Sequence, residues 1–408
     1  MVTSFSSLWL KSIKRLTKAP RAKRRRLVKS AVIKTVSALV NTAVGVKKRT
    51  PVGSTTRRVP MAKLLLPSAV QARHPGIQSP GIKRGLPPVG AMWQKAYFST
   101  TETPRTGVVQ RMAYWLYIPT QAASAAEKNG PMPLVVLLHG CKQTAPDIAS
   151  VTRMNVLAER KGFAVLYPHQ SLSADRNRCW PWYKRSVQSG KGDVAMLAEM
   201  IAQLQKHHHF DSCRTYAAGL SAGAALATIL ALRHPELIAA LGLHSAPVFA
   251  TSDSALSAYR TMQYGAPHAH STAIRQFLTE QVDFPGLPVM VIHGDDDVVV
   301  RRINALELVQ QFLLVNAHKL GNVEPARRRH TGSGTALKRR LAHHTDTWYA
   351  KRKPYVVSCT VNGLGHAWSG GDPATAFSEP RGPNASLMMW QFFQHHQRKP
   401  DADIDPAV

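Results

Sequence analysis

The five residues Gly219-Leu220-Ser221-Ala222-Gly223 form a Gly-x-Ser-x-Gly motif between a predicted strand and a predicted helix. The strand is predicted over 214–219, and residues 222–232 favour a helix that stops before His234-Pro235. A sharp turn between the two elements lifts a serine hydroxyl above the edge of a sheet, and small flanking residues let the strand and the helix pack closely. The same motif also occurs in ordinary turns. A nucleophilic serine therefore requires a base and an acid elsewhere in the chain.

Two downstream segments can supply the acid and the base. The apolar run 289–294 is a predicted strand that opens into an acidic loop, and 355–361 is a second predicted strand that leads through a turn to His366. Three neighbouring aspartates compete for the role of the acid: Asp295, Asp296 and Asp297. The order serine, acid, histidine is that of α/β-hydrolases. A solvated turn is the alternative for the aspartates, and a hydrogen-bonding loop histidine is the alternative for His366.

A third segment, upstream of the serine, can stabilise negative charge on a reacting carbonyl oxygen. The buried strand predicted over 133–138 ends at His139-Gly140-Cys141, and the second oxyanion donor of such folds lies in the loop after this strand. The first donor is the amide that follows the nucleophile. We therefore predict that the backbone N–H groups of Cys141 and Ala222 form an oxyanion hole and that Gln143 orients the loop. A plain strand-ending turn is the alternative.

Five motifs together resemble the poly(3-hydroxybutyrate) depolymerase family of esterases. They occur in the family's order over about residues 108–397: His139-Gly-Cys-Lys-Gln143, Arg178-Cys-Trp-Pro-Trp182, Gly219-Leu-Ser-Ala-Gly-Ala224, His293-Gly-Asp-Asp-Asp297 and Gly363-Leu-Gly-His-Ala-Trp-Ser-Gly-Gly371. The family acid is separated from its His-Gly pair by two residues, which selects Asp297. The resemblance implies an α/β-hydrolase fold, with a mostly parallel central sheet and helices on both faces. It also implies ester hydrolysis without a metal or an organic cofactor.

The implied catalytic triad is Ser221, His366 and Asp297. We expect the three side chains to converge at the carboxyl edge of the sheet, with the Ser221 hydroxyl within hydrogen-bond range of His366. His244 and His293 are the rival bases. Trp180 and Trp368 match family motifs and, with Gln143, are candidate substrate contacts. For the two tryptophans core packing is the alternative. Cys141 and Cys179 lie in motifs expected near the site, and whether they pair is left open.

The resemblance does not identify which ester is the substrate. We expect poly(3-hydroxybutyrate) or short hydroxyalkanoate oligomers, with feruloyl, acetyl or sugar esters as the alternative. The chain ends at Val408, soon after a last helix predicted over 384–397 and without a polymer-binding module. Amorphous granules or soluble esters are therefore expected rather than crystalline polymer. The alternative of another class is a non-catalytic granule-binding or surface-binding protein on a hydrolase scaffold.

Positive charge is concentrated before the predicted hydrolase domain. The net charge is +30, and 21 lysines and arginines precede the first acidic residue, Glu102. Residues 1–95 are therefore predicted to be a separate, largely disordered basic extension, with apolar residues at helical spacing that favour a partly amphipathic helix. We expect it to attach to an anionic surface or a polyester granule. Nucleic acid, a transit peptide and a solvated tail are the alternatives.

The expected location is cytoplasmic and granule-associated, because no clear signal peptide and no apolar stretch of ~18 residues is found. An extracellular location is the alternative.

Two segments inside the hydrolase domain resemble insertions. Residues 247–285 contain two short amphipathic helices that could cap the site or simply connect core strands. The arginine-rich and lysine-rich segment 325–340 is predicted to be a mobile surface loop.

Overall fold

The computed structural model describes residues 91–100, 110–120, 130–267, 269–320, 326–332, 340–350 and 352–399. The chain divides into two compact units, Met1–Arg84 and Gly85–Val408. The first unit lies outside the described residues. The amphipathic helix and the surface attachment expected of the basic extension therefore stay predictions.

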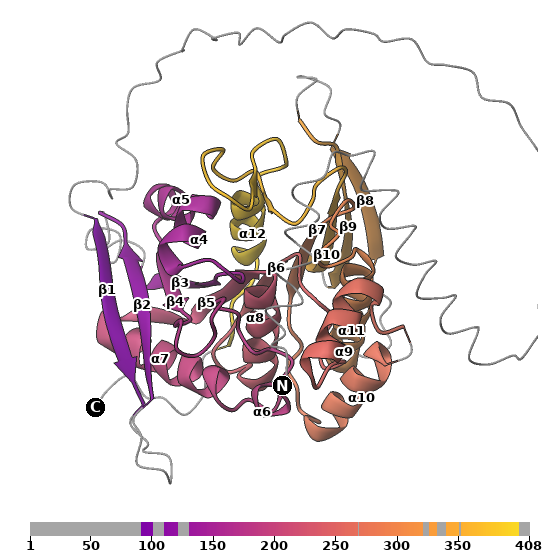
Figure 1. Ribbon diagram of the computed structural model, residues 1–408, viewed down its shortest axis with the longest axis horizontal. Helices are drawn as coiled ribbons and strands as arrows, with labels where there is room; N and C mark the ends of the chain where they lie inside the picture. Colours follow the sequence, from indigo (N-terminus) through magenta and orange to yellow (C-terminus); the bar gives the residue numbers. More distant parts are fainter. Residues whose placement is uncertain are drawn as a thin grey trace, which may run out of the picture. The chain divides into compact units, whose positions relative to one another are not determined.

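A ten-stranded sheet forms the centre of the described part of the second unit (Figure 1). Its strands lie in the order β1-β2-β4-β3-β5-β6-β7-β10-β9-β8. The six strands from β4 to β10 in this order are parallel, and the pairs at both edges are antiparallel. The strands are β1 (Met92–Ser99), β2 (Arg111–Ile118), β3 (Met132–Leu138), β4 (Ala164–His169), β5 (Phe210–Leu220), β6 (Ala240–His244), β7 (Val289–Gly294), β8 (Ala326–Gly332), β9 (His343–Ala350) and β10 (Lys353–Val361).

Helices cover both faces of this sheet (Figure 1), as the sequence predicted. One face carries α4 (Ala145–Thr152), α5 (Met154–Lys161) and α12 (Ala385–Phe393). The other face carries α7 (Asp193–His208), α8 (Ala222–Arg233) and α11 (Ile303–Leu320). The remaining described elements are α6 (Arg185–Gln188), α9 (Ala255–Tyr264), α10 (His270–Glu280) and the short parallel pair β11 (Trp368–Ser369) and β12 (Ser378–Glu379).

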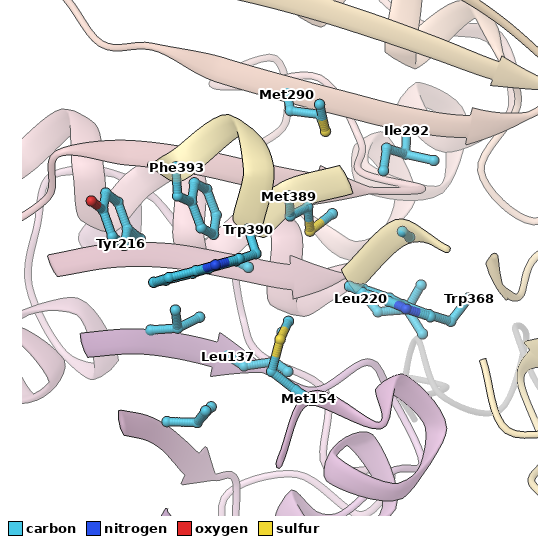
Figure 2. Close-up of a cluster of buried hydrophobic side chains, with 14 of the residues drawn as sticks. Leu137, Met154, Tyr216, Leu220, Met290, Ile292, Trp368, Met389, Trp390 and Phe393 are labelled. Carbon is cyan, nitrogen blue, oxygen red and sulfur yellow. The ribbon is translucent and has the colours of Figure 1, made fainter. Parts of the chain in front are cut away.

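The core under α12 combines aromatic rings and sulfur-containing side chains with aliphatic residues (Figure 2). Trp390 stacks on Phe163 with ring centroids 3.9 Å apart, and Phe393 stacks on Tyr216 at 4.7 Å. Figure 2 shows Trp390 and Phe393 beside Met389, over the strands that carry Tyr216 and Leu137. Because successive side chains of a strand point to opposite faces, the strands contribute alternate residues to this cluster. Burial of these large side chains fixes α12 on the sheet.

The expected boundary of the basic extension at residue 95 is wrong. Strand β1 begins at Met92 and pairs with β2 along its whole length, from Met92 opposite Ile118 to Ser99 opposite Arg111. This pairing satisfies the backbone of residues 92–99 and buries Phe98. The lack of acidic residues had assigned residues 92–95 to the basic extension, but pairing with β2 decides their structure. The sheet also extends upstream of residue 108, where the hydrolase domain was expected to begin.

The mobile loop predicted over 325–340 is also corrected for the residues that the structure describes. Residues 326–332 form β8, which pairs antiparallel with β9 at the edge of the sheet. Charged residues are common in edge strands because they discourage pairing with further chains, so three consecutive arginines do not exclude a strand. Residues 333–339 lie outside the described residues.

The two helices expected within 247–285 are present as α9 and α10. Both pack against α11 rather than standing alone. Their role as a cap over the site stays a prediction.

The turn from β5 into α8 requires two glycines because three backbones meet there. A Cβ atom on Gly219 would lie 2.5 Å from the carbonyl carbon of Gly223. A Cβ atom on Gly223 would lie 2.3 Å from the carbonyl oxygen of Leu138, the last residue of β3. No side-chain rotation can relieve contacts with backbone atoms. The absence of side chains at these two positions therefore lets α8 start directly against β3 and β5.

We expect the substitution Gly223→Ala to lower the free energy of unfolding by about 1–3 kcal/mol or more, because the methyl group forces α8 away from β3. Urea denaturation followed by circular dichroism measures this change. Gly365→Ala is the matched control, since no atom lies within 4 Å of the Cβ that it would add. Equal losses of stability in the two variants would contradict the close-packing explanation.

Candidate active site

Ser221, Asp297 and His366 each follow a strand that ends at the same edge of the sheet. Ser221 follows β5, Asp297 lies in the loop after β7, and His366 lies in the loop after β10. These three strands and β6 are parallel neighbours, so their carboxyl ends lie side by side. Ligands of open α/β sheets bind at this edge.

Ser221 occupies a strained backbone conformation between β5 and α8. Its φ is 57° and its ψ is −119°, a region that residues other than glycine rarely adopt. The Ser221 N–H donates a hydrogen bond of 2.9 Å to the carbonyl oxygen of His244, at the end of β6. This hydrogen bond and the close glycine contacts hold the turn, which places the serine at the start of α8.

The Asp297 carboxylate is buried and fully engaged. Its Oδ2 lies 2.8 Å from Nδ1 of His366, and its Oδ1 accepts hydrogen bonds of 2.9 Å from the N–H groups of Val299 and Val300. Neither amide was predicted from the sequence, although an aspartate that bonds to amides two and three residues ahead is a common turn. Burial raises the pKa of Asp297, but its interactions with His366, with His293 and with the Val300 amide outweigh burial and lower the pKa to about 2.

The two competing aspartates have different surroundings. Asp295 and Asp296 are exposed, whereas Asp297 is 3% exposed. The Asp295 carboxylate accepts a hydrogen bond of 2.6 Å from the N–H of Gly363 and so holds the turn that precedes His366. Among the three aspartates, Asp297 is therefore the one whose carboxylate contacts His366.

The rival histidines His244 and His293 are buried, and the hydrogen bonds that their rings form go to groups other than Ser221, although His293 Nδ1 has no partner in the described part of the chain. His244 Nε2 accepts a hydrogen bond of 3.1 Å from the Ser369 N–H, and its Nδ1 lies 3.2 Å from the Ser245 hydroxyl. Burial lowers the pKa of His244 to about 3. His293 Nε2 lies 2.8 Å from the carbonyl oxygen of Val300, and burial lowers its pKa also. His366 is partly exposed.

The expected hydrogen bond between the Ser221 hydroxyl and His366 is not formed among the described residues; the hydrogen bond of the His366 ring is to Asp297. His366 nevertheless lies close enough to His244 to affect its pKa, and the His244 carbonyl binds the Ser221 N–H. Catalytic hydrogen bonds are often long without substrate and shorten when it binds. The contact between the serine and the histidine stays a prediction.

Hydrogen bonds and a disulfide hold the loop after β3 in place. Gln143 is buried, and its Oε1 accepts a hydrogen bond of 2.8 Å from the Gly140 N–H. Cys141 forms a disulfide with Cys179, which settles the pairing that the sequence left open. The next residue, Trp180, donates from Nε1 to the His139 carbonyl oxygen at 2.9 Å. Within the described part of the chain, the N–H groups of Cys141 and Ala222 donate no hydrogen bond.

Three predicted substrate contacts lie inside the protein. Trp180 and Trp368 are both 0% exposed, and the Trp368 ring stacks on His244 with centroids 4.9 Å apart. The Trp368 Nε1 donates to the Ser386 hydroxyl at 3.2 Å. Gln143 is 2% exposed. For the two tryptophans, burial favours the alternative of core packing, and the buried Gln143 bonds the loop rather than facing a substrate.

Two relatives with known names are similar to this chain in sequence. The chain is 28% identical over 251 residues, 60% of its length, to the poly(3-hydroxyalkanoate) depolymerase C of Paucimonas lemoignei, and it covers 57% of that protein. It is 30% identical over 133 residues, 32% of its length, to the probable acetylxylan esterase A of Aspergillus fumigatus, of which it covers 33%. The chain thus spans about half or less of the length of these relatives.

Solved structures and a family model extend the comparison. An acetyl xylan esterase from Aspergillus awamori superposes with a TM-score of 0.53 at 20% sequence identity, over 74% of this chain and 99% of that one. This similarity shows the α/β-hydrolase fold. Residues 112–333, more than half of the chain, match the model of the family described as Esterase PHB depolymerase. The expectation drawn from the five motifs is confirmed, and the chain belongs to the PHB depolymerase family of esterases.

Proposed function

We propose that this chain is a serine esterase that hydrolyses carboxylic esters through Ser221, His366 and Asp297. The main support is the buried Asp297 carboxylate, 2.8 Å from His366 Nδ1, at the sheet edge where Ser221 occupies its strained turn. Membership of the esterase family and the names of the relatives support the same reaction. The alternative of a non-catalytic scaffold has no comparable support, because all three groups are present and the acid is paired with the base.

The proposed reaction begins with proton transfer from Ser221 to His366. Asp297 is ionised at neutral pH because its pKa is about 2, and it fixes the N–H of His366 on Nδ1. Nε2 is then free to accept the serine proton while the serine oxygen attacks the ester carbonyl. The buried carboxylate also stabilises the imidazolium that forms.

Negative charge on the carbonyl oxygen would be held by the N–H groups of Cys141 and Ala222. Ala222 is the first residue of α8, a helix of 12 residues, so the helix dipole adds to this stabilisation. His366 then protonates the leaving alcohol, and an acyl-serine remains. Water enters, His366 removes its proton, and hydrolysis of the acyl-serine restores the enzyme.

The proposed substrates are poly(3-hydroxybutyrate) or short hydroxyalkanoate oligomers. The name of the Paucimonas lemoignei relative and the name of the family support this class. Acetylated sugar esters are the second candidate, supported by the acetylxylan esterase relative.

The disulfide bears on the proposed location. Disulfides persist in oxidising compartments, so Cys141–Cys179 favours the extracellular alternative over the cytoplasm. Among the helices that the structure describes, none is long and apolar enough to cross a membrane. Attachment of the basic residues before β1 to an anionic surface or a polyester granule remains part of the proposal, on the strength of their positive charge.

The Ser221→Ala variant tests the reaction itself. We expect it to lose turnover of p-nitrophenyl butyrate by at least about 10³-fold, because the nucleophile is removed. The wild type should release 3-hydroxybutyrate from amorphous polymer or oligomers faster than acetate from acetylated xylan. Equal turnover of the aryl ester by both proteins would exclude the serine mechanism, and faster release of acetate would favour the second substrate class.

The Asp297→Asn variant tests the assignment of the acid. We expect kcat to fall by roughly 10⁴-fold, because the amide favours the wrong tautomer of His366 and cannot stabilise its positive charge. Asp296→Asn is the matched control, since Asp296 is exposed. Steady-state kinetics on p-nitrophenyl butyrate distinguish the two. A large loss in the control with little loss in Asp297→Asn would overturn the assignment.

The Cys179→Ala variant tests whether the disulfide holds the oxyanion loop. We expect kcat to fall by up to about 10²-fold with a smaller change in KM, because a misplaced Cys141 N–H affects the transition state more than substrate binding. Cys213→Ala is the control, since Cys213 is a free cysteine. Unchanged kcat in Cys179→Ala, with the loss of the disulfide verified by mass spectrometry, would show that the other hydrogen bonds suffice.

A further inference from the structure

The loop between Asp297 and α11 contacts the end of α9. The side-chain amide of Gln263, in the last turn of α9, donates from Nε2 to the carbonyl oxygen of Val299 at 2.9 Å and to that of Val298 at 3.2 Å. Gln263 belongs to the segment 247–285 and lies outside the five family motifs. The proposed ester mechanism gives this side chain no role.

The two peptide groups that Gln263 binds are the same two that bind the Asp297 carboxylate. The Val298 carbonyl shares a peptide group with the Val299 N–H, and the Val299 carbonyl shares one with the Val300 N–H. Both N–H groups donate to Asp297 Oδ1 at 2.9 Å. These peptides are trans, so their C=O and N–H bonds point in opposite directions, and Gln263 and Asp297 hold the loop from opposite sides.

Side-chain packing alone does not fix both peptides. Val300 is buried, and its carbonyl oxygen also accepts a hydrogen bond of 2.8 Å from His293 Nε2. Val298, in contrast, is 42% exposed, so the orientation of the peptide after it depends on hydrogen bonds. Hydrogen bonds in a chain polarise one another, and a donor on a carbonyl oxygen therefore also strengthens the N–H of the same peptide as a donor.

The end of α9 is itself fixed relative to this loop. The Met262 carbonyl oxygen, next to Gln263, accepts a hydrogen bond of 2.8 Å from the Arg301 N–H. The Ala266 N–H donates at 2.6 Å to Oε2 of Glu307 on α11. Gln263 thus extends from a helix end that is anchored on both sides, so its amide can hold the loop in one place.

We propose that Gln263 is a positioning residue for the acid of the triad, because it holds the two peptides whose N–H groups fix the Asp297 carboxylate. This inference rests on the proposed function, since it requires Asp297 to be the acid. A rotated carboxylate would weaken the hydrogen bond of 2.8 Å to His366 Nδ1, and misplacement by about 1 Å can cost roughly 10²-fold in rate. The segment 247–285 then contributes to the reaction through α9, whether or not it covers the site.

The Gln263→Met variant tests this role, since methionine has a similar length and no N–H donor. We expect kcat on p-nitrophenyl butyrate to fall at least about tenfold with a change in KM below about twofold, because the alignment of the acid changes and substrate binding does not. Gln263→Lys keeps N–H donors and should lose less than about threefold. The matched control is Gln276→Met, an exposed glutamine on α10, which should keep the wild-type kcat.

Three results of this comparison would overturn the proposal. They are a wild-type kcat in Gln263→Met, equal losses in Gln263→Met and Gln263→Lys, and an equal loss in the control. Circular dichroism verifies that each variant is folded.

A double-mutant cycle with Asp297→Ala distinguishes positioning of the acid from a general loss of structure. Without the carboxylate there is nothing for the loop amides to orient, so Gln263→Met should change the residual kcat of Asp297→Ala by less than about twofold. Independent effects would multiply instead, and a further loss as large as in the wild-type background would refute the role. If Asp297→Ala itself kept the wild-type turnover, the proposed acid and this inference would fail together. If Asp297→Ala loses turnover and Gln263→Met does not, this inference alone fails.

Discussion

The rest of the structure depends on the direct contact between the backbone of α8 and the ends of β3 and β5. Because Gly223 lies against the Leu138 carbonyl, the start of α8 and the loop after β3 are fixed within a few ångströms of each other. Ala222 and Cys141, whose amides we propose as oxyanion donors, are close in sequence to Gly223 and Leu138 respectively. The positive φ of Ser221 follows from the same crowding, since the chain must turn sharply between β5 and α8. One steric constraint thus places Ser221 and both proposed donors.

Burial distinguishes the proposed base from the other histidines near it. His139, His244 and His293 are almost completely buried, and burial lowers the pKa of all three, to about 4 for His139 and about 3 for His244. They remain neutral and serve as hydrogen-bonding parts of the scaffold. His366 is partly exposed and adjoins an ionised carboxylate, so it is the histidine that can both meet a substrate and carry a proton.

Local patterns predicted the strands and helices that carry the site. Apolar runs predicted β7 and α8, while a short strand-like run over 214–219 and an alternating run over 355–361 predicted β5 and β10. The same patterns could not choose among Asp295, Asp296 and Asp297, which differ in burial rather than in sequence; the family motif made that choice. The sequence did not predict strands β1 and β8. Each is stabilised by pairing with a neighbouring strand, β2 and β9 respectively, and composition does not show which segments pair.

The burial of the motif side chains explains why the family motifs indicate a reaction but not an ester. Gln143 and Trp180 hold the backbone of the loop after β3, and Trp368 stacks on the histidine whose carbonyl anchors Ser221. Each of these side chains acts on the geometry of the reacting groups, and none is exposed enough to touch a substrate without rearrangement. The choice of ester must then depend on exposed residues that surround the site. These residues are not part of the family motifs, so the motifs do not determine their chemistry. A polyester and an acetylated sugar can therefore be substrates of relatives that share one catalytic scaffold.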